Sequence, residues 1–235
     1  MTRWHVAVLI PARDEEQLLA RCLESVVRAC LALPSSASFD VIVAVDSSTD
    51  RTKEIADRMV AGYGAVIFTD AGIVGKARAQ AAELALQNHN LPFERMWIAN
   101  TDADSFVPES WIVEQLSLAD QGIEAIAGTV DVDSFEEHDR FVPKKFRETY
   151  LIRPDGTHPH VHGTNLGVRA DVYRKAGGWR EIATAEDHDL WNRIGAVGAS
   201  RISAGHIRVL TSGRRTGRAP RGFAERLAAH NGSAA

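Results

Sequence analysis

Short apolar runs alternate with segments of helical periodicity in the first half of the chain, and this alternation is the strongest constraint on its fold. The apolar runs lie at 6–10, 41–45, 65–68 and 96–99. Continuous runs of this kind are typical of strands buried on both faces of a parallel sheet. The segments with helical spacing lie between them, at 18–27, 50–60 and 76–87. We therefore predict an α/β fold with a mixed, mainly parallel sheet flanked by helices.

The length of 235 residues fits one domain with a large buried core. No apolar run approaches the roughly 20 residues that span a bilayer, and the sequence begins without a signal-peptide pattern. Cys22 and Cys30 lie on one predicted helix, about 12 Å apart along its axis, which is too far for a disulfide. Core thiols fit a reducing compartment, so we expect a cytoplasmic protein without a transmembrane segment.

Polar loops follow the first, second and fourth predicted strands. They span 11–16, 46–52 and 100–104. Because the carboxyl ends of parallel strands meet at one edge of a sheet, we expect these loops to line one crevice. The first strand is followed by no Gly-x-Gly-x-x-Gly motif, and the chain has no Walker-type loop. Neither a standard dinucleotide site nor a P-loop is indicated.

Two acidic clusters are the candidate chemical groups. Asp102 and Asp104, one residue apart at a strand end, can hold Mg²⁺ or Mn²⁺ against a diphosphate, because these ions take oxygen ligands. Glu186 and Asp187 open a predicted helix and offer a base. The alternatives are an ordinary turn at 102–104, before a helix starting at Pro108, and a capping box in which Thr184 caps the helix.

Basic residues offer contacts for the same diphosphate. Lys76 and Arg78 lie at the start of a predicted helix, where phosphate binds readily, although a surface lysine is the alternative. Between 201 and 235 there are seven arginines and a single acidic residue. Arg214 and Arg215 follow a glycine that would allow a loop to fold over a ligand. A solvated face is the alternative, and the acidic remainder of the chain argues against nucleic-acid binding.

A charged stretch from 131 to 162 interrupts the sheet pattern and suggests an acceptor-side lid or insertion. It ends in three alternating histidines, His158, His160 and His162. In an extended chain their imidazoles would point to one side. Metal ligation, substrate contact and a structural role all remain open, and His162 is the candidate for completing a metal shell.

Several motifs, in order along nearly the whole chain, resemble those of the family-2 glycosyltransferases, which have the GT-A fold. Pro11–Glu16 resembles the opening Pro-x-x-Asn-Glu-Glu element, and 46–52 resembles the nucleoside-binding Asp-Asp-Gly-Ser-x-Asp-x-Thr. The remaining matches are Asp102-Ala103-Asp104 to the metal motif, Gly163-Thr164-Asn165 through Gly177-Gly178-Trp179 to the acceptor-side segment, and Glu186-Asp187 to the Glu-Asp pair.

The resemblance implies inverting transfer of a sugar from a nucleotide diphosphate sugar, expected to be a UDP-sugar, to a small-molecule or lipid-linked acceptor. Asp187 is expected to be the base, beside Glu186, and Asp102 and Asp104 to hold Mg²⁺ or Mn²⁺. The donor-binding residues expected are Pro11, Ala12, Arg13, Glu15, Asp46, Lys76, Arg78, Asp102, Arg214 and Arg215. The acceptor-side residues expected are Gly163, Asn165 and Trp179.

On this resemblance, residues 1–104 form the nucleotide-sugar-binding half and 105–215 the acceptor and catalytic half. The basic segment 216–235 follows, with a frayed end from 228. Val45 and Ser47 depart from the family pattern, so the identity of the donor's nucleobase is not defined by the sequence. The chain has no Gln-x-x-Arg-Trp element of processive members, which favours transfer of a single sugar.

Two other functions remain as alternatives. A sugar-phosphate nucleotidyltransferase would need a glycine-rich loop after the first strand, and a non-catalytic nucleotide-sugar-binding module would not need Asp187. The oligomeric state is not defined by the sequence.

Overall fold

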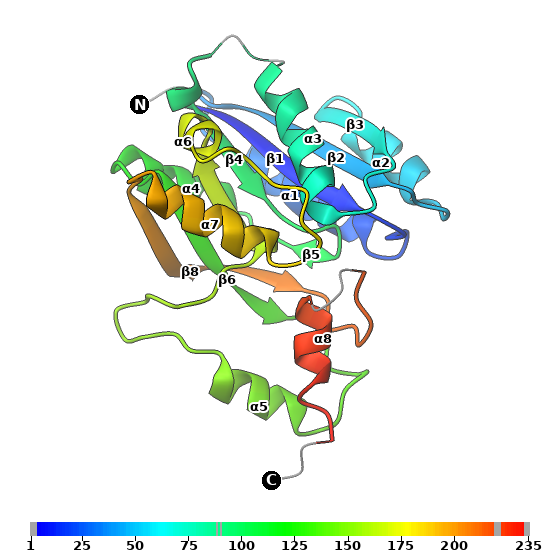
Figure 1. Cartoon of the computed structure of the whole chain (residues 1–235). Helices are drawn as coiled ribbons and strands as arrows, with labels where there is room; N and C mark the ends of the chain where they lie inside the picture. Colours follow the sequence, from blue (N-terminus) through cyan, green and yellow to red (C-terminus); the bar gives the residue numbers. More distant parts are fainter. Residues whose placement is uncertain (1–3, 88, 90, 219–221, 233–235) are drawn as a thin grey trace.

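The computed structural model describes residues 4–87, 89, 91–218 and 222–232. Within them, one mixed sheet runs through the molecule (Figure 1). Its strands are β1 (His5–Ala12), β2 (Ser38–Asp46), β3 (Gly64–Thr69), β4 (Met96–Asn100), β5 (Ser105–Phe106), β6 (Ala125–Val132), β7 (Leu166–Arg169) and β8 (Arg201–Thr211). Their order across the sheet is β3-β2-β1-β4-β7-β6-β8-β5.

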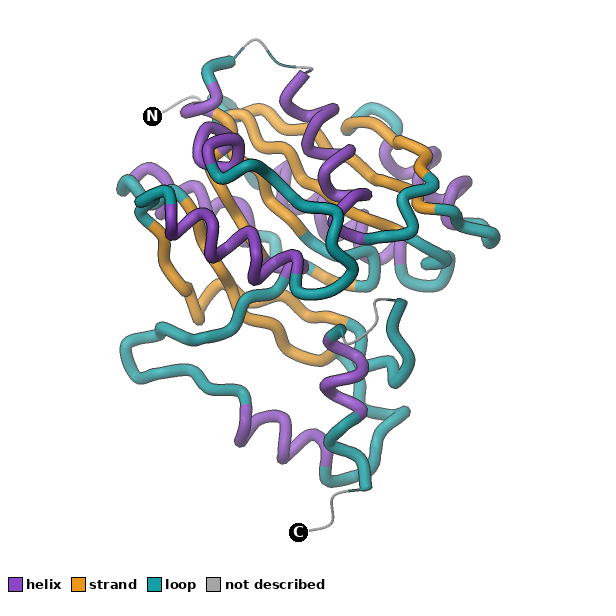
Figure 2. Tube along the Cα trace, viewed as in Figure 1, coloured by secondary structure: helices purple, strands orange, loops and turns teal. Residues whose placement is uncertain are grey.

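Helices cover both faces of this sheet (Figure 2). They are α1 (Leu19–Leu31), α2 (Thr52–Val60), α3 (Val74–Gln87), α4 (Trp111–Asp120), α5 (Val142–Thr149), α6 (Ala170–Lys175), α7 (Glu186–Ala196) and α8 (Phe223–Ala228), with short 3-10 turns η1 (Phe93–Arg95) and η2 (Gly163–Asn165). The mixed, mainly parallel α/β sheet flanked by helices is confirmed.

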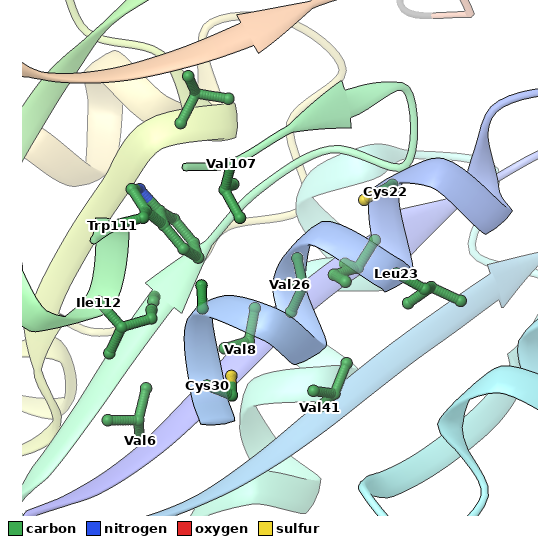
Figure 3. Close-up of a cluster of buried hydrophobic side chains, with 14 of the residues drawn as sticks. Val6, Val8, Cys22, Leu23, Val26, Cys30, Val41, Val107, Trp111 and Ile112 are labelled. Atoms are coloured by element: carbon green, nitrogen blue, oxygen red, sulfur yellow. The ribbon is translucent and has the colours of Figure 1, made fainter. Parts of the chain in front are cut away.

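Two apolar cores fill the space between sheet and helices, because successive strand residues point to opposite faces. On one face Val6 and Val8 of β1 pack with residues of α1, α2 and α4 (Figure 3). On the other, Ala7 and Leu9 pack with α3, α6 and α7. Burial on both faces explains why β1, β2 and β4 contain continuous apolar runs.

Strands β1 to β4 pair in parallel, so their carboxyl ends lie at one edge of the sheet. Ala12 at the end of β1 pairs with Val45 of β2, and Leu9 pairs with Asn100 of β4. β7 then enters antiparallel to β4. This order brings the loops after β1, β2 and β4 together, as the sequence predicted.

The expected start of a helix at Pro108 is wrong by three residues. Helix α4 begins at Trp111, whose backbone N–H donates to the carbonyl of Pro108 at 3.0 Å. Pro108 therefore belongs to the turn that precedes the helix.

Helix α5, which follows β6, and the C-terminal helix α8 lie together below the main layers (Figure 1). Phe146 of α5 and Leu227 of α8 pack together in a third apolar cluster. Near the C-terminal end, within the segment from 228 that the sequence predicts to be frayed, Asn231 lies 2.9 Å from His138 and the Gly232 N–H donates to Asp139 at 2.8 Å. Residues 233–235 lie outside the described part.

Cys22 and Cys30 are buried and free, as expected (Figure 3). Burial raises the pKa of the Cys30 thiol to about 12, which makes it unreactive. Within the described residues, no helix combines the length and apolar character needed to cross a membrane.

Candidate active site

A cavity of about 310 Å³ opens at the carboxyl ends of β1, β2 and β4. Residues from the second half of the chain, including the start of α7 and α8, close its other side. The residues expected from the sequence that line it are Pro11, Ala12, Arg13, Glu15, Asp46, Arg78, Asp102, Asp104, His162, Gly163, Glu186, Asp187 and Arg214. The cavity thus brings together the acidic motifs of both halves.

Four expected site residues lie outside this lining: Lys76, Arg215, Asn165 and Trp179. Asn165 is fully used inside the fold, because its amide donates to the carbonyls of Thr129 and Ile207 and accepts from Trp111. Arg215 is exposed, and its backbone N–H donates to Glu137 at 2.8 Å. Asn165 therefore stabilises the fold around it, whereas the Arg215 side chain lies on the surface.

The loops after β1 and β2 are locked to each other. The Glu15 backbone N–H donates to the Thr52 hydroxyl at 2.7 Å, and the Thr49 N–H donates to Asp14 at 2.8 Å. Asp14 and Ser47 both have a φ of 50°, a conformation that suits glycine better. Ser47 occupies the position where the family pattern has glycine, so the backbone keeps that conformation without the glycine. The loops form a fixed wall around buried Asp46.

Hydroxyl groups hold the turn that carries Asp102 and Asp104. The Thr164 hydroxyl accepts from the Asp102 backbone N–H at 3.2 Å and lies 2.7 Å from the Ser105 hydroxyl. Ser105 also contacts Thr211 of β8 at 3.2 Å. Both carboxylates are therefore oriented by residues from the second half of the chain. Ser105 and Thr211 carry no local sequence signal for this role, because their partners lie 59 and 106 residues away along the chain.

Arg78 joins the two acidic clusters. Its guanidinium is 2% exposed and forms ion pairs with Asp102 and with Glu186, the latter at 2.5 Å. Burial opposes its charge, but Asp102 and Glu186 raise the pKa of Arg78 above its ordinary value. Burial in turn raises the pKa of Glu186, against the effect of Arg78. Arg78 is thus a buried cation between the expected metal motif and the expected base.

Two neighbours leave Arg78 little freedom. The Trp179 ring lies 5.0 Å from its guanidinium carbon, within the range of a cation–π contact. A Cβ atom on Gly163 would lie 2.5 Å from the Arg78 nitrogens, so only glycine fits there. Trp179 is buried and acts on the site through Arg78 instead of lining the cavity.

Arg214 makes a second bridge across the cavity. Its guanidinium binds both oxygens of Glu15, at 2.7 and 2.9 Å, and lies 2.7 Å from Asp104 Oδ2. Burial raises the pKa of Asp104, and Arg214 opposes that shift. Arg78 binds Oδ1 of Asp102, and Asp104 Oδ1 accepts from the Ser105 hydroxyl at 3.4 Å.

The expected base lies at the start of α7. Asp187 Oδ2 accepts from the Gly163 backbone N–H at 3.0 Å, and Oδ1 accepts from the His188 N–H at 2.7 Å. The capping box expected at Thr184 does not form, because Ala185 is the N-cap and no side chain caps the helix. Ala185 has a φ of 60°, a strained conformation for a non-glycine residue beside the acidic pair.

The three histidines stack on one side, as their alternation predicted. The rings of His158 and His160 lie 5.8 Å apart, and those of His160 and His162 lie 6.0 Å apart. His162 Nε2 lies 2.9 Å from the Tyr150 hydroxyl, and burial lowers the pKa of His162 to about 3. In the part of the chain that the structure describes, the ligand atoms of Asp102, Asp104 and His162 do not all lie within 4.8 Å of one another.

The C-terminal segment contributes more to the cavity than the sequence indicated. Phe223 and Arg226 of α8 line it, as does Arg218. Arg218 donates to the backbone carbonyl of Asp14 at 2.6 Å and so ties this segment to the loop after β1. The run of arginines was the available signal, but it did not identify which of them face the cavity.

This sheet, with a polar crevice at its strand ends, is the architecture of the GT-A glycosyltransferases. Residues 7–177 match the model of the family described as Glycosyl transferase family 2, and the chain belongs to that family.

Relatives and solved structures agree with this assignment. The chain is 28% identical over 205 residues to the probable glycosyltransferase YdaM of Bacillus subtilis (strain 168), covering 82% of this chain and 47% of that protein. It thus spans about half the length of this relative. S. aureus TarS 1-349 in complex with UDP-GlcNAc superposes with a TM-score of 0.65 at 15% identity, covering 93% of this chain and 60% of TarS 1-349. Mannosyltransferase PcManGT from Pyrobaculum calidifontis, in complex with GDP-Man and Mn²⁺, superposes with a TM-score of 0.66 at 18% identity. The match covers 95% of this chain and 68% of PcManGT.

Replacing Arg78 tests its buried bridge. Arg78→Met should lower the free energy of unfolding by about 3–5 kcal/mol, because it leaves buried Glu186 without a counter-charge. The matched control is Arg21→Met, which removes the 2.6 Å ion pair with Asp133 from a side chain that is 41% exposed. That loss should be at most about 1 kcal/mol. Urea denaturation measures both, and similar losses would contradict the role assigned to Arg78.

Proposed function

We propose that this glycosyltransferase moves a single sugar from a nucleotide diphosphate sugar to a hydroxyl acceptor, with metal assistance and with inversion at the anomeric carbon. The observation that carries the proposal is the shared cavity of Asp102, Asp104 and Asp187. Diphosphate binding and proton removal need groups on opposite sides of one reacting sugar. Asp102, Asp104 and Asp187 all line this one cavity.

The donor would lie along the loops at the strand ends. Asp46 is buried at the end of β2, and Asp102 and Asp104 follow β4. TarS contains UDP-GlcNAc and PcManGT contains GDP-Man with Mn²⁺. A UDP-sugar is the first donor to test and a GDP-sugar is its matched alternative.

The carboxylates of Asp102 and Asp104 would hold Mg²⁺ or Mn²⁺. Such an ion neutralises the charge that develops on the departing diphosphate. Arg214 would move its hydrogen bonds from Asp104 to phosphate oxygens, since guanidinium suits phosphate as well as carboxylate. The cavity then stays charge-balanced before and after the donor binds. His162 lies on the wall of the same cavity, and ligation by it is a weaker part of this proposal.

Asp187 would act as the base. It would accept the proton of the acceptor hydroxyl while that oxygen bonds to the anomeric carbon and the bond to the diphosphate breaks. Attack from the face opposite the leaving diphosphate inverts the anomeric carbon. The Gly163 and His188 N–H groups hold the carboxylate in place. A positioned base of this kind contributes about 10²–10⁴ in rate.

Residues 1–104 would supply most of the donor contacts and 105–215 the acceptor side and the base. The segment from 216 onward would complete the acceptor side, because Phe223 and Arg226 line the cavity and the Phe223 ring lies 6.0 Å from that of His162. An aromatic ring with a nearby guanidinium suits a sugar or an anionic acceptor, which fits a small-molecule or lipid-linked hydroxyl.

Asp187→Asn separates binding from chemistry. We expect donor affinity close to wild type and transfer reduced by two or more orders of magnitude, because the amide cannot take the proton. Asp189→Asn is the matched control, since Asp189 lies in the same first turn but bonds Arg193 at 2.6 Å instead of lining the cavity. Calorimetry and a sugar-transfer assay measure both properties. Unchanged transfer by Asp187→Asn would refute the assignment, and donor binding without transfer by the wild type would favour a binding module.

The two adjacent arginines provide a second test. Arg214→Ala should lower turnover more than donor affinity, because its charge acts where negative charge develops on the leaving group. Arg215→Ala should leave both unchanged, since its side chain is exposed and outside the cavity lining. Steady-state kinetics with each variant gives the comparison. Equal effects of the two substitutions would show that the basic segment acts only through its overall charge.

A further inference from the structure

A second cluster of ligand-type side chains lies at the other end of the sheet. His5 opens β1, Asp40 lies near the start of β2, and His89 follows α3. At about 3.3 Å per residue, β1 separates His5 from Ala12 at the cavity by about 23 Å. The cluster is therefore remote from the proposed donor site and takes no part in it.

The three side chains converge on one point. His89 Nε2 lies 2.6 Å from Asp40 Oδ2, and His5 Nε2 lies 3.6 Å from the same oxygen. One ligand atom from each residue lies within 4.8 Å of the other two. Zinc bonds of about 2.0–2.1 Å place the ligand atoms of a tetrahedral site roughly 3.3 Å apart. Small side-chain adjustments would therefore bring all three into ligand positions.

His5 presents a buried nitrogen without a hydrogen bond. The residue is 1% exposed, its Nδ1 lies 3.0 Å from the Ser38 hydroxyl, and its buried Nε2 has no hydrogen-bond partner. The 3.6 Å separation from Asp40 is too long for a hydrogen bond. An unsatisfied buried polar atom costs about 1–3 kcal/mol. The Ser38 contact orients the ring in the way that outer partners orient metal-bound histidines.

Charge and access also suit a divalent cation. The His5 and His89 rings lie with their centroids 3.4 Å apart, an arrangement that disfavours two charged imidazoles. Burial, with His89 as the next cause, lowers the pKa of His5 to about 4. The His89 and Asp40 side chains are 22% and 34% exposed, so an ion can enter from solvent.

We propose that His5, Asp40 and His89 form a zinc site, completed by a water ligand, that fastens the segment after α3 to the starts of β1 and β2. Two imidazoles and one carboxylate are a donor set that Zn²⁺ accepts in tetrahedral geometry. The role is structural, because the site joins three separate segments and lies far from the proposed chemistry.

The test is calorimetric titration of ZnCl₂ into the chelator-treated full chain that carries Asp104→Asn, which weakens metal binding in the cavity. We expect one zinc ion, with affinity lowered more than about 100-fold by His89→Ala or by Asp40→Asn. Ser38→Ala should lower it about 10–100-fold, as loss of an outer partner does. The control is His206→Ala, whose side chain is exposed on β8.

Two further readouts accompany the titration. Co²⁺ in place of Zn²⁺ should give the visible absorption of a tetrahedral site in the starting protein and lose it in His89→Ala. Zinc should also raise the melting temperature, because it binds the folded state. No zinc binding, or equal affinity in His89→Ala and His206→Ala, would overturn the proposal. If Asp40→Asn fails to fold, His89→Ala decides the outcome, because its side chain is partly exposed.

Discussion

The paired burial of Arg78 is the interaction on which the active site depends. A guanidinium that is 2% exposed is stable in the interior only when its charge is compensated, and its two partners come from separate elements. Asp102 follows β4 and Glu186 opens α7. Gly163 leaves room for the guanidinium, and Trp179 covers it. The buried charge of Arg78 is neutralised only when the turn after β4 and the start of α7 are both in place. Arg78 therefore couples the position of the expected metal motif to that of the helix that carries the expected base.

Arg214 adds a second ion-pair bridge with a different character. It is 20% exposed and links Glu15, from the loop after β1, to Asp104. Such a partly solvated pair is more easily exchanged than the buried pair of Arg78. The cavity thus combines one fixed cation with one that can change partners. A metal-bound diphosphate would bring two positive and several negative charges into this space, and Arg214 is the group best positioned to rebalance them.

β1, β2 and β4 could be predicted because parallel strands buried on both faces are continuous apolar runs. β3 lies at the edge of the sheet and is only partly buried, but it too is a short apolar run. The second half gave a weaker signal: β6 is buried but contains a glycine and a threonine, β7 has four residues, and in β8 buried Ile207 and Val209 alternate with exposed Arg208. The acidic motifs could also be predicted, since each is local. The partners of Arg78 could not, because Asp102 and Glu186 lie 24 and 108 residues away. The same holds for the cluster of His5, Asp40 and His89, which only the pairing of β1 with β2 and the end of α3 bring together.

The proposed function requires that Asp102 and Asp104 hold a divalent ion on a nucleoside diphosphate. The most direct measurement is calorimetric titration of UDP and of GDP, each with and without Mn²⁺, into wild type, Asp104→Asn and the control Asp131→Asn. Asp131 is 42% exposed and lies outside the cavity lining. We expect Mn²⁺ to strengthen binding of at least one nucleotide to wild type and to Asp131→Asn, and we expect Asp104→Asn to lose this gain. Equal Mn²⁺-dependent binding by wild type and Asp104→Asn would contradict it.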